Sequence, residues 1–427
     1  MTQDTQLLPS QRPVVGIDIG KHRHAAAGVD PGGRDFGQPM MFDNNRAGVD
    51  RLEEKILTPL RAMGSVLVAM EATAHYWMCL FFELKRRGYE VVVLNPLETA
   101  KKQRRRLRKT KTDKIDARSI ARFVREGAFG RSRIPDEPTF ELRQIVRHRW
   151  RLQEVVAQLQ IVALTHVDVL FPELPDVLRP WLKSFRALLR TEAGLRPSLL
   201  LAQADHTRAT VTSASRRRIP DSRIDELLRC AHDTIGIRRG EAILDSLLRS
   251  SLDLIETIEK QIDALDRQLA VRIAGRSSPL ESLGLSPHII ATIHAECEPV
   301  AGFRNSRQLV AYAGLDPATF QSGDPDPRGG HVSKRGPKRL RQALCLATMG
   351  LILKPGIFQD AYRRARGRGK HHLSALVKTA SLLARVVFRM LHDNKPFNPD
   401  HAQARGNPNQ AVGETPHRMP ADASSRA

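Results

Sequence analysis

The sequence predicts an α/β domain of ribonuclease-H-like topology at the N-terminus, followed by a mainly α-helical remainder. Two observations predict this fold class. Strand and helix signals up to about residue 130 occur in the order strand, strand, strand, helix, strand, helix, strand, helix. Four acidic residues also fall at the places in that order that meet at one edge of such a sheet. They are Asp18, Glu71, Asp113 and Asp116.

The expected strands are runs of apolar and β-branched residues bounded by turn residues. They cover residues 14–20, 24–30, 40–42, 65–71 and 89–94. Apolar residues spaced by three or four predict helices at residues 49–60 and 74–87, and a basic helix that ends near Gly127. In the ribonuclease-H-like layout, the middle of the first strand, the end of the fourth and the last helix converge on one edge. This agreement between element order and acid placement is the strongest support for the fold.

The composition indicates a polyanionic partner. The chain has 427 residues, enough for two or three domains with separate cores. Its formal net charge is +22 and its pI is near 10.5. Such an excess of positive charge suits nucleic acid, and it predicts binding that weakens steeply with salt. Charge alone does not separate an enzyme from a ribosomal or chromatin protein.

The cysteines and the apolar segments indicate a cytosolic protein. Cys79, Cys230, Cys297 and Cys345 are widely scattered without CxxC spacing, which predicts reduced core residues rather than a zinc site. The first twelve residues are polar and lack the apolar run of a signal peptide. No stretch is long and apolar enough to span a membrane, so we expect no membrane partner.

Asp18 and Glu71 lie within or at the end of apolar runs. Asp18 interrupts the run at residues 14–20, and Glu71 closes the run at residues 66–70. A carboxylate in such a run is costly to bury unless a cation or another partner pairs with it. Taken singly, Asp18 could be a strand-end residue, or part of a phosphate loop as in actin-like kinases, whose further motifs are missing here. Glu71 could be an acid favoured by a helix N-terminus.

Asp113 and Asp116 lie three residues apart and therefore share one face of a helix. Taken alone, they could be solvated acids that relieve the charge of the preceding basic residues. Together with Asp18 and Glu71 in the expected element order, they predict a site of hard oxygen ligands for Mg²⁺. Two ions at such a site, with Mn²⁺ as a substitute, would stabilise the attacking and leaving oxygens of a phosphodiester.

Basic residues gather in two segments that we expect to bind nucleic acid. In residues 101–111, eight of the eleven residues are Lys or Arg, and the run leads directly into the acids. Cations beside a metal site can hold a nucleic-acid backbone next to the scissile bond. A nuclear address would have a similar composition. The residues expected to bind are Lys101, Lys102, Arg104, Arg105, Arg106, Arg108, Lys109, Lys111, Lys334, Arg335, Lys338 and Arg339.

Residues 140–170 and 241–275 predict two long helices. The second has apolar residues with heptad-like spacing, so we expect a helical spacer that packs on itself, with pairing between subunits as the alternative. The region between them is mixed helical and has no assigned function. A second compact unit is expected after residue 277, and its turn at residues 283–290 resembles a helix-hairpin-helix, whose amides can hold a phosphate. Residues beyond 398 are predicted to be disordered.

A polar loop at residues 316–330 contains Ser322 between Gln321 and Gly323. Serines in loops are usually turn residues, and a serine hydroxyl becomes nucleophilic only when a base or a metal activates it. Nothing local in the sequence supplies that activation. The basic residues that follow the loop could hold phosphate and stabilise charge in a transition state.

These motifs resemble the DEDD transposases of the insertion-sequence-110 family. The segments that carry the resemblance are GIDIGKHRHAAAGVD, VAMEATAHYW, NPLETAKKQRRRLRKTKTDKIDARSIA, and FRNSRQLVAYAGLDPATFQSG followed by SKRGPKRLRQAL. They occur in the family's order from about Val14 to Phe397. The resemblance implies a RuvC-like domain at residues 13–135, a helical coiled-coil region at 136–276 and a C-terminal transposase domain at 277–397. A disordered start at 1–12 and a disordered tail at 398–427 flank them.

For the site, the resemblance implies four metal ligands and one nucleophile. They are Asp18, Glu71, Asp113, Asp116 and Ser322, the last forming a phosphoserine link to DNA. The family often carries a double serine in this loop, whereas here Gln321 precedes a single one, so Ser333 and Ser306 are alternatives. The resemblance further implies a homo-oligomer (dimer or tetramer) whose composite site joins acids and serine from different protomers. It also implies a structured guide RNA that pairs with donor and target DNA in the bacterial cytoplasm, at the nucleoid.

We therefore expect a Mg²⁺-dependent, serine-using DNA recombinase that excises and inserts its own element and binds the element ends and the target. One alternative keeps the acids and drops the serine, as in a RuvC-like nuclease that hydrolyses branched DNA. The other is a basic nucleic-acid-binding module whose acids are structural.

Overall fold

The computed structural model describes residues 8–399 apart from 95–112, 128, 130, 131, 133, 317–331 and 335, and for Asp113 and Lys114 it describes the backbone. The chain divides between Ile134 and Pro135 into two compact units. Unit 1 covers residues 1–134 and unit 2 covers residues 135–427.

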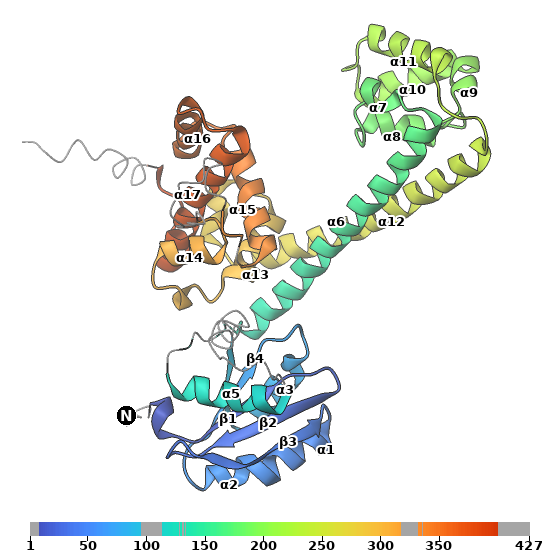
Figure 1. Cartoon of the computed structure of the whole chain (residues 1–427). Coiled ribbons are helices and arrows are strands. Elements are labelled where there is room, and N and C mark those ends of the chain that lie inside the picture. Colours follow the sequence, from blue (N-terminus) through green and yellow to red (C-terminus); the bar gives the residue numbers. More distant parts are fainter. Residues whose placement is uncertain are drawn as a thin grey trace, which may run out of the picture. The chain divides into compact units, whose positions relative to one another are not determined.

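Unit 1 is built on a five-stranded mixed sheet (Figure 1). Its strands are β1 (Val14–Asp18), β2 (Arg23–Val29), β3 (Asp35–Asp43), β4 (Leu67–Glu71) and β5 (Glu90–Leu94). Their order across the sheet is β3-β2-β1-β4-β5. β2 is antiparallel to β1 and β3, and β4 is parallel to β1 and β5. This is the ribonuclease-H-like order, so the predicted element order is confirmed.

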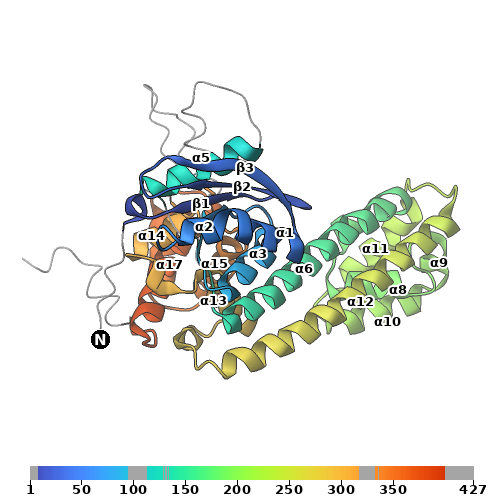
Figure 2. The same cartoon turned by 90° about the horizontal axis from the view of Figure 1, so that it is seen from below.

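Helices cover both faces of this sheet (Figure 2). One face carries α1 (Arg46–Leu52), the π-helix η2 (Glu53–Leu57), α2 (Thr58–Arg61) and α3 (Trp77–Arg86), and the other carries α5 (Asp113–Arg125). Side chains alternate along a strand, so Val15 and Ile17 of β1 face the first group of helices whereas Val14 faces α5. Two buried cores therefore sandwich the sheet.

The contact between α5 and β1 depends on Gly16. A Cβ atom at Gly16 would lie 2.2 Å from the carbonyl oxygen of Ala117 and 2.4 Å from the amide nitrogen of Ala121. Ala117 and Ala121 are themselves fully buried. The backbone of the helix thus lies directly against the strand, at a separation that only glycine allows.

Arg12 anchors the chain that precedes β1. Its buried side chain donates to the carbonyl oxygen of Ser65 at 2.8 Å and to the carboxylate of Glu90 at 2.7 Å. The residues before it form the short 3-10 helix η1 (Pro9–Gln11). Ordered structure therefore begins before residue 13, although polar composition predicts a disordered start at 1–12. The composition does not reveal that one of these polar residues is buried against two partners distant in sequence.

Unit 2 begins with an antiparallel hairpin of two 34-residue helices, α6 (Glu137–Leu170) and α12 (Glu241–Ala274) (Figure 1). Val156 of α6 packs with Ile255 and Ile262 of α12. An ion pair of 2.6 Å joins Arg149 to Asp266. The two predicted long helices are confirmed, and they pack on each other within one chain, as the spacer interpretation predicts.

Shorter helices close the far end of the hairpin and form what we call the distal module, residues 171–240. They are α7 (Leu174–Val177), α8 (Lys183–Arg190), α9 (Pro197–Ala202), α10 (Ala204–Ser215) and α11 (Asp221–Asp233). The module has its own core around Phe171, Phe185 and Leu227, which extends into the hairpin through Val167 and Leu248. The mixed helical region of the sequence is therefore a folded subdomain.

The C-terminal helices pack on the near end of the hairpin. They are η3 (Pro279–Leu283), α13 (Pro287–Cys297), η4 (Val300–Gly302), α14 (Ser306–Tyr312), α15 (Lys338–Leu351), α16 (Ile357–Gly367) and α17 (His372–Asp393). Their core includes Trp150 of α6 and Leu269 of α12. This shared core explains why the hairpin and the C-terminal helices form one unit, although the sequence predicts separate regions. Gly284, with a φ of 63°, lies in the predicted helix-hairpin-helix-like turn, whose phosphate binding stays a prediction.

A buried polar network fixes this shared region. The carboxylate of Glu298 accepts hydrogen bonds from Thr139 at 2.9 Å and Arg276 at 2.7 Å, and lies 2.6 Å from Nδ1 of His294. Burial alone would raise the pKa of Glu298, but these partners outweigh it and lower the pKa to about 2. Nε2 of His294 contacts the hydroxyl of Ser278 at 2.6 Å. Ser278 is only 6% exposed, so this serine–histidine–glutamate chain is structural.

Two further predictions concern cysteines and membranes. None of the four cysteines forms a disulfide, and Cys297 is buried. The prediction of core cysteines is wrong for Cys79, which is exposed because its position on α3 faces solvent. None of the helices in the described parts of the chain combines the length and apolar character of a membrane span. The predicted disordered tail lies outside the described residues from 400 onward.

We expect Gly16→Ala to destabilise unit 1 by about 1–3 kcal/mol, because the added methyl group overlaps the backbone of α5. Hydrogen–deuterium exchange of the intact protein should become faster in β1 and α5 and stay unchanged in α6 and α12. Gly32→Ala is the matched control, because Gly32 is exposed and its nearest neighbour is the side chain of Asp30 at 3.3 Å. Equal exchange in the wild type and Gly16→Ala would contradict the close packing.

Candidate active site

Asp18 and Glu71 are the last residues of two neighbouring parallel strands. The register of β1 and β4 ends with Ile17 opposite Met70, so the next residue along each strand is one of these acids. Both side chains are half-buried. Equivalent positions in parallel strands point to the same face, so the two carboxylates share one face at one edge of the sheet.

That face is the one covered by α5. Asp18 lies two residues after Gly16, whose position contacts the helix backbone. Glu71 lies two residues after Ala69, which belongs to the core beneath α5. Because alternate residues of a strand share a face, both acids lie on the α5 side of the sheet.

α5 runs antiparallel to β1. Its last residue, Arg125, donates two hydrogen bonds, at 2.7 and 2.6 Å, to carbonyl oxygens in the turn after β2. Ala117, near the start of α5, packs with Ala25, which is the partner of Asp18 in the sheet. The first turn of α5, which carries the other two predicted acids, therefore lies at the edge where β1 and β4 end.

Ion pairs hold α5 in this orientation. Arg118 and Arg122 contact the carboxylate of Asp35 in β3 at 3.2 and 2.9 Å. All three side chains are partly exposed, so each pair adds little to stability. Together with the hydrogen bonds of Arg125 they fix the position of the helix along its axis.

The structure thus brings all four predicted positions to one edge through the backbone. Asp18, Glu71 and Asp116 are half-buried there. Asp113 is the first residue of α5, and its side chain lies outside the described part. Among the side chains that the structure describes, no three His, Cys, Asp or Glu are gathered closely enough to hold a metal ion. The joint coordination of a metal by the four acids stays a prediction.

The basic run at residues 101–111 lies outside the described residues, but the residues that anchor its segment are described. Leu94, at the end of β5, is paired with Glu71 in the register of the parallel strands. Asp113 begins α5 at the same edge. The described residues on either side of this segment, Leu94 and Asp113, therefore lie at the same edge as the acids.

Ser322 also lies outside the described residues, within 317–331, and contacts between described residues join the two ends of its loop. The backbone N–H of Ser333 donates to the carbonyl oxygen of Asp316 at 2.9 Å, and the Ser333 hydroxyl donates to the Asp316 carboxylate. A Cβ atom at Gly336 would lie 1.9 Å from the carbonyl oxygen of Tyr312, so the chain returns to α14 in close contact. The two ends of the serine loop are clasped together.

The predicted cations after this loop have different surroundings. Lys334 is exposed, and Arg335 lies outside the described residues. Lys338 is exposed and forms an ion pair with Glu154 of α6 at 3.0 Å. Arg339 is half-buried, and its Nε has no hydrogen-bond partner in the structure. Their role in binding nucleic acid stays a prediction.

Two residues that the sequence analysis does not predict also lie at the acidic edge. They belong to the connection between β1 and β2. Lys21 and His22 are exposed and follow Asp18 in this short hairpin connection. The available signal was the short interval before the next strand, because a tight hairpin keeps its loop at the end where the first strand stops. The connection therefore lies at the end of the sheet that carries Asp18.

Two family models match this chain. A model for DEDD transposases of the IS110 type, described as a transposase, matches residues 15–172, which include all four acids. A model described as a transposase of the IS116/IS110/IS902 family matches residues 280–363, which include the serine loop. Together the matches cover more than half of the chain. The chain belongs to the IS110 family of transposases.

Relatives of this transposase align along nearly the whole chain. It is 26% identical over 387 residues to the insertion element IS110 uncharacterized 43.6 kDa protein of Streptomyces coelicolor, covering 89% of this chain and 94% of that protein. It is 25% identical over 402 residues to the insertion element IS116 uncharacterized 44.8 kDa protein of Streptomyces clavuligerus, with coverages of 90% and 96%. A pilin gene-inverting protein of Moraxella bovis is 22% identical over 396 residues, with coverages of 90% and 97%.

Membership of this family makes the chain a DNA-processing enzyme of the DEDD class, which uses divalent metal ions. The acidic edge fits such ions in its chemistry, because carboxylates are the hard oxygen ligands that Mg²⁺ prefers. Strand ends and a helix also hold side chains more firmly than loops do. The predicted family is thereby confirmed.

We expect Asp18→Asn to weaken the response of the transposase to Mg²⁺. If the site binds Mg²⁺ with a dissociation constant of about 1 mM, then about 10 mM Mg²⁺ stabilises the wild type by about 1.4 kcal/mol, and the variant by less. Thermal unfolding in EDTA and in Mg²⁺ measures the difference. Asp43→Asn is the control, because Asp43 ends β3 in an exposed ion pair with Arg23 and should leave the response intact. An equal response in Asp18→Asn would count against the metal site.

Proposed function

We propose that this transposase is a Mg²⁺-dependent DNA recombinase that excises its insertion sequence and inserts it elsewhere through a phosphoserine intermediate. The observation that carries the proposal is the convergence of two acidic strand ends with the first turn of α5 at one edge of a ribonuclease-H-like sheet. Metal-dependent phosphoryl transfer needs hard oxygen ligands grouped at such an edge. In this proposal unit 1 is a RuvC-like domain, and α6 and α12 form its coiled coil.

The residues that would hold the metal are Asp18, Glu71, Asp113 and Asp116, with two Mg²⁺ ions, or Mn²⁺ in their place. When bound, such ions withdraw charge from a scissile phosphate and favour loss of the proton from a nucleophilic hydroxyl. The contribution of the chain is to hold the carboxylates in place, since two end strands of the same sheet and one begins a helix packed on that sheet.

Ser322 is the proposed nucleophile. Its Oγ forms a bond to phosphorus and loses its proton, while the bond from phosphorus to the leaving deoxyribose oxygen breaks and that oxygen gains a proton. The serine ester keeps the energy of the broken phosphodiester, so a hydroxyl of another strand can displace the serine without an external energy source. Direct hydrolysis would lose that energy to water.

The stem of the serine loop supports the choice of Ser322 over its alternatives. The Ser333 hydroxyl donates to Asp316 and so helps to clasp the stem. Ser306 begins α14, directly after the helix cap Asn305, and is half-buried. Ser322 lies in sequence between Asp316 and Ser333, the two residues that join the ends of this loop.

The DNA partners are the element ends and the target, and a structured RNA that pairs with both is the proposed guide. The anchors of the segment with the basic run lie at the acidic edge, so its cations would hold the backbone next to the scissile bond. A net charge of +22 suits an assembly with two kinds of nucleic acid. We place this assembly in the bacterial cytoplasm, at the nucleoid.

We further propose a homo-oligomer, a dimer or a tetramer, in which the acids of one protomer act with the serine of another. An exposed apolar face along the hairpin supports it, with residues at heptad-like spacing: Val155, Val162 and Val169 of α6, and Ile243, Leu247 and Leu254 of α12. Each of these residues directly precedes an inward-facing position of its helix. In two antiparallel helices such positions lie on the same side of the pair. This face fits the corresponding face of a second copy.

Ser322→Ala should abolish a covalent protein–DNA adduct. Purified wild type with Mg²⁺, RNA transcribed from the sequence flanking its element and labelled element-end DNA should form an adduct that survives denaturation, because the serine ester is covalent. Ser333→Ala and Ser306→Ala are matched controls that keep the adduct. Denaturing gel electrophoresis reads the result.

The other outcomes identify other functions. Strand cleavage without an adduct in the wild type, and unchanged in Ser322→Ala, would indicate a hydrolytic RuvC-like nuclease. DNA transactions that survive Asp18→Asn would indicate a binding module with structural acids.

A mixture of Asp18→Asn and Ser322→Ala should regain activity that neither variant has alone. In a dimer with two composite sites, random mixing restores about one quarter of wild-type adduct formation, since half of the dimers are mixed and each has one intact site. No activity in the mixture would contradict a composite site.

The same assay tests the apolar face. Val162→Glu combined with Leu247→Glu should remove the regained activity and lower the mass measured by light scattering. Ile161→Glu is the control, because Ile161 is equally exposed but lies outside that face.

A further inference from the structure

The distal module has no part in the site described so far. It falls almost wholly between the residues matched by the two transposase models, 15–172 and 280–363. None of the proposed catalytic or cationic residues lies in it. It nevertheless has a hydrophobic core of its own, which stabilises its fold.

Six of the twelve arginines in the module take part in ion pairs or hydrogen bonds with other residues. Arg186 of α8 pairs with Glu259 at 2.6 Å, and Arg190 pairs with Glu256 at 3.1 Å, both acids lying on α12. These pairs attach the module to the hairpin. Arg208 of α10 likewise pairs with an acid of α11.

Three arginines without such partners are adjacent in the turn between α10 and α11. Arg216, Arg217 and Arg218 are exposed, and in the described structure their guanidinium groups form no ion pair or hydrogen bond. Arginines at a helix C-terminus can be explained by the helix dipole. That explanation concerns charges beside the last carbonyl groups, and it does not require three adjacent cations that repel one another.

The backbone at this turn is also unusual. Arg216 and Arg217 have φ values of 53° and 58°, in the left-handed region. Helices commonly end with one such residue, and glycine or asparagine takes it at least cost. Here two successive positions with this strain, about 1–2 kcal/mol each, are occupied by arginine. The turn therefore places two of the three arginines in a strained backbone conformation.

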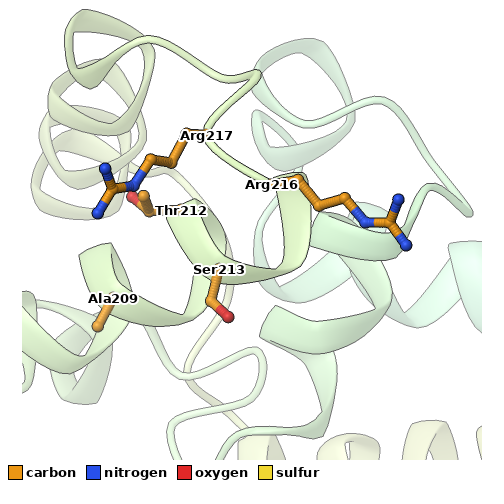
Figure 3. Close-up of a pocket in the computed structure, with 5 residues that line it drawn as sticks. All are labelled: Ala209, Thr212, Ser213, Arg216 and Arg217. Atoms are coloured by element: carbon orange, nitrogen blue, oxygen red, sulfur yellow. The ribbon is translucent and has the colours of Figure 1, made fainter.

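The same turn borders an open hollow of about 530 Å³, lined by Ala209, Thr212, Ser213, Arg216 and Arg217. Figure 3 shows the two arginine side chains extending from the turn in opposite directions. A single small phosphate would need the guanidinium groups to converge on it. Diverging guanidinium groups instead suit separate phosphates along one polymer.

We infer that the α10–α11 turn of the distal module binds the phosphodiester backbone of a nucleic acid. Arginine, serine and threonine side chains are typical donors to backbone phosphates, and such contacts carry no sequence information. The inference rests on the proposed function in one respect, because it takes nucleic acid as the partner of the protein. It adds an anchoring point that is separate from the basic run and the serine loop.

The test is the full-length triple variant Arg216→Gln, Arg217→Gln, Arg218→Gln. Fluorescence anisotropy measures its affinity for an element-end DNA duplex and for an RNA duplex of the same sequence, at several salt concentrations. Loss of up to three phosphate contacts should reduce the slope of log affinity against log salt by about 2–3 in at least one arm. Replacing the three residues by lysine should preserve the slope.

The matched control is Arg190→Gln, Arg208→Gln, Arg238→Gln in the same module. It removes the same charge from arginines that already have acidic partners, so the slope should stay near that of the wild type. Thermal unfolding by circular dichroism confirms that both variants are folded. A slope unchanged from wild type with both DNA and RNA, or an equal loss in the control, overturns the inference. A reduced slope with only the DNA duplex or only the RNA duplex supports the inference and shows which of the two the turn binds.

Strand joining, measured together with the salt slope for the wild type and the arginine variant, separates this inference from the proposed function. If the wild type joins no strands but the arginine variant shows the reduced slope, the proposed function fails and the inference stands. If strands are joined while the slope is unaffected by the arginines, the inference fails alone.

Discussion

The packing of α5 directly against β1 is the constraint on which the candidate site depends. Two of the acids belong to the sheet, and the other two lie on a helix more than forty residues further along the chain. The packing of this helix on the sheet brings them to one edge. No side chain fits at position 16, because a Cβ atom there would lie 2.2 Å from the carbonyl oxygen of Ala117. Arg125 and the ion pairs of Asp35 then fix the helix along its axis. Residues that have no proposed part in the reaction therefore position the four acids.

Much of unit 1 can be predicted from sequence because its signals are local. Alternation and run length identify four of the five strands, and their order is enough to place Asp18 and Glu71 at one edge. The exception is β3, which spans nine residues where three were expected. Only one of its residues is fully buried, so its extent is set by backbone pairing with β2 rather than by an apolar pattern. The shared core of unit 2 cannot be predicted from local sequence patterns either, because it joins Trp150 to helices more than a hundred residues away in the chain.

The candidate site shows the same limit in its details. The residue types that bind Mg²⁺ can be recognised one by one, but Lys21 and His22 reach the site only through the turn geometry of a hairpin. The clasp between Asp316 and Ser333 joins two ends of a loop whose sequence gives no sign of it. The assignment of Ser322 rests on family resemblance, because no pattern of nearby residues distinguishes a nucleophilic serine from a turn serine.

The cationic segments raise the question of where sequence preference comes from. In the proposed assembly, positive charge acts at residues 101–111, at residues 334–339 and at the α10–α11 turn. Arginine and lysine at such places gain affinity by releasing counterions from phosphates, which are the same at every base pair. Several phosphate contacts along one duplex fix its position and direction without reading it. An enzyme that holds DNA in this way can join strands at a chosen place only if another component reads the bases. In the proposed assembly, base pairing by a guide RNA would supply that reading, and the side chains of the protein would hold the DNA and carry out phosphoryl transfer.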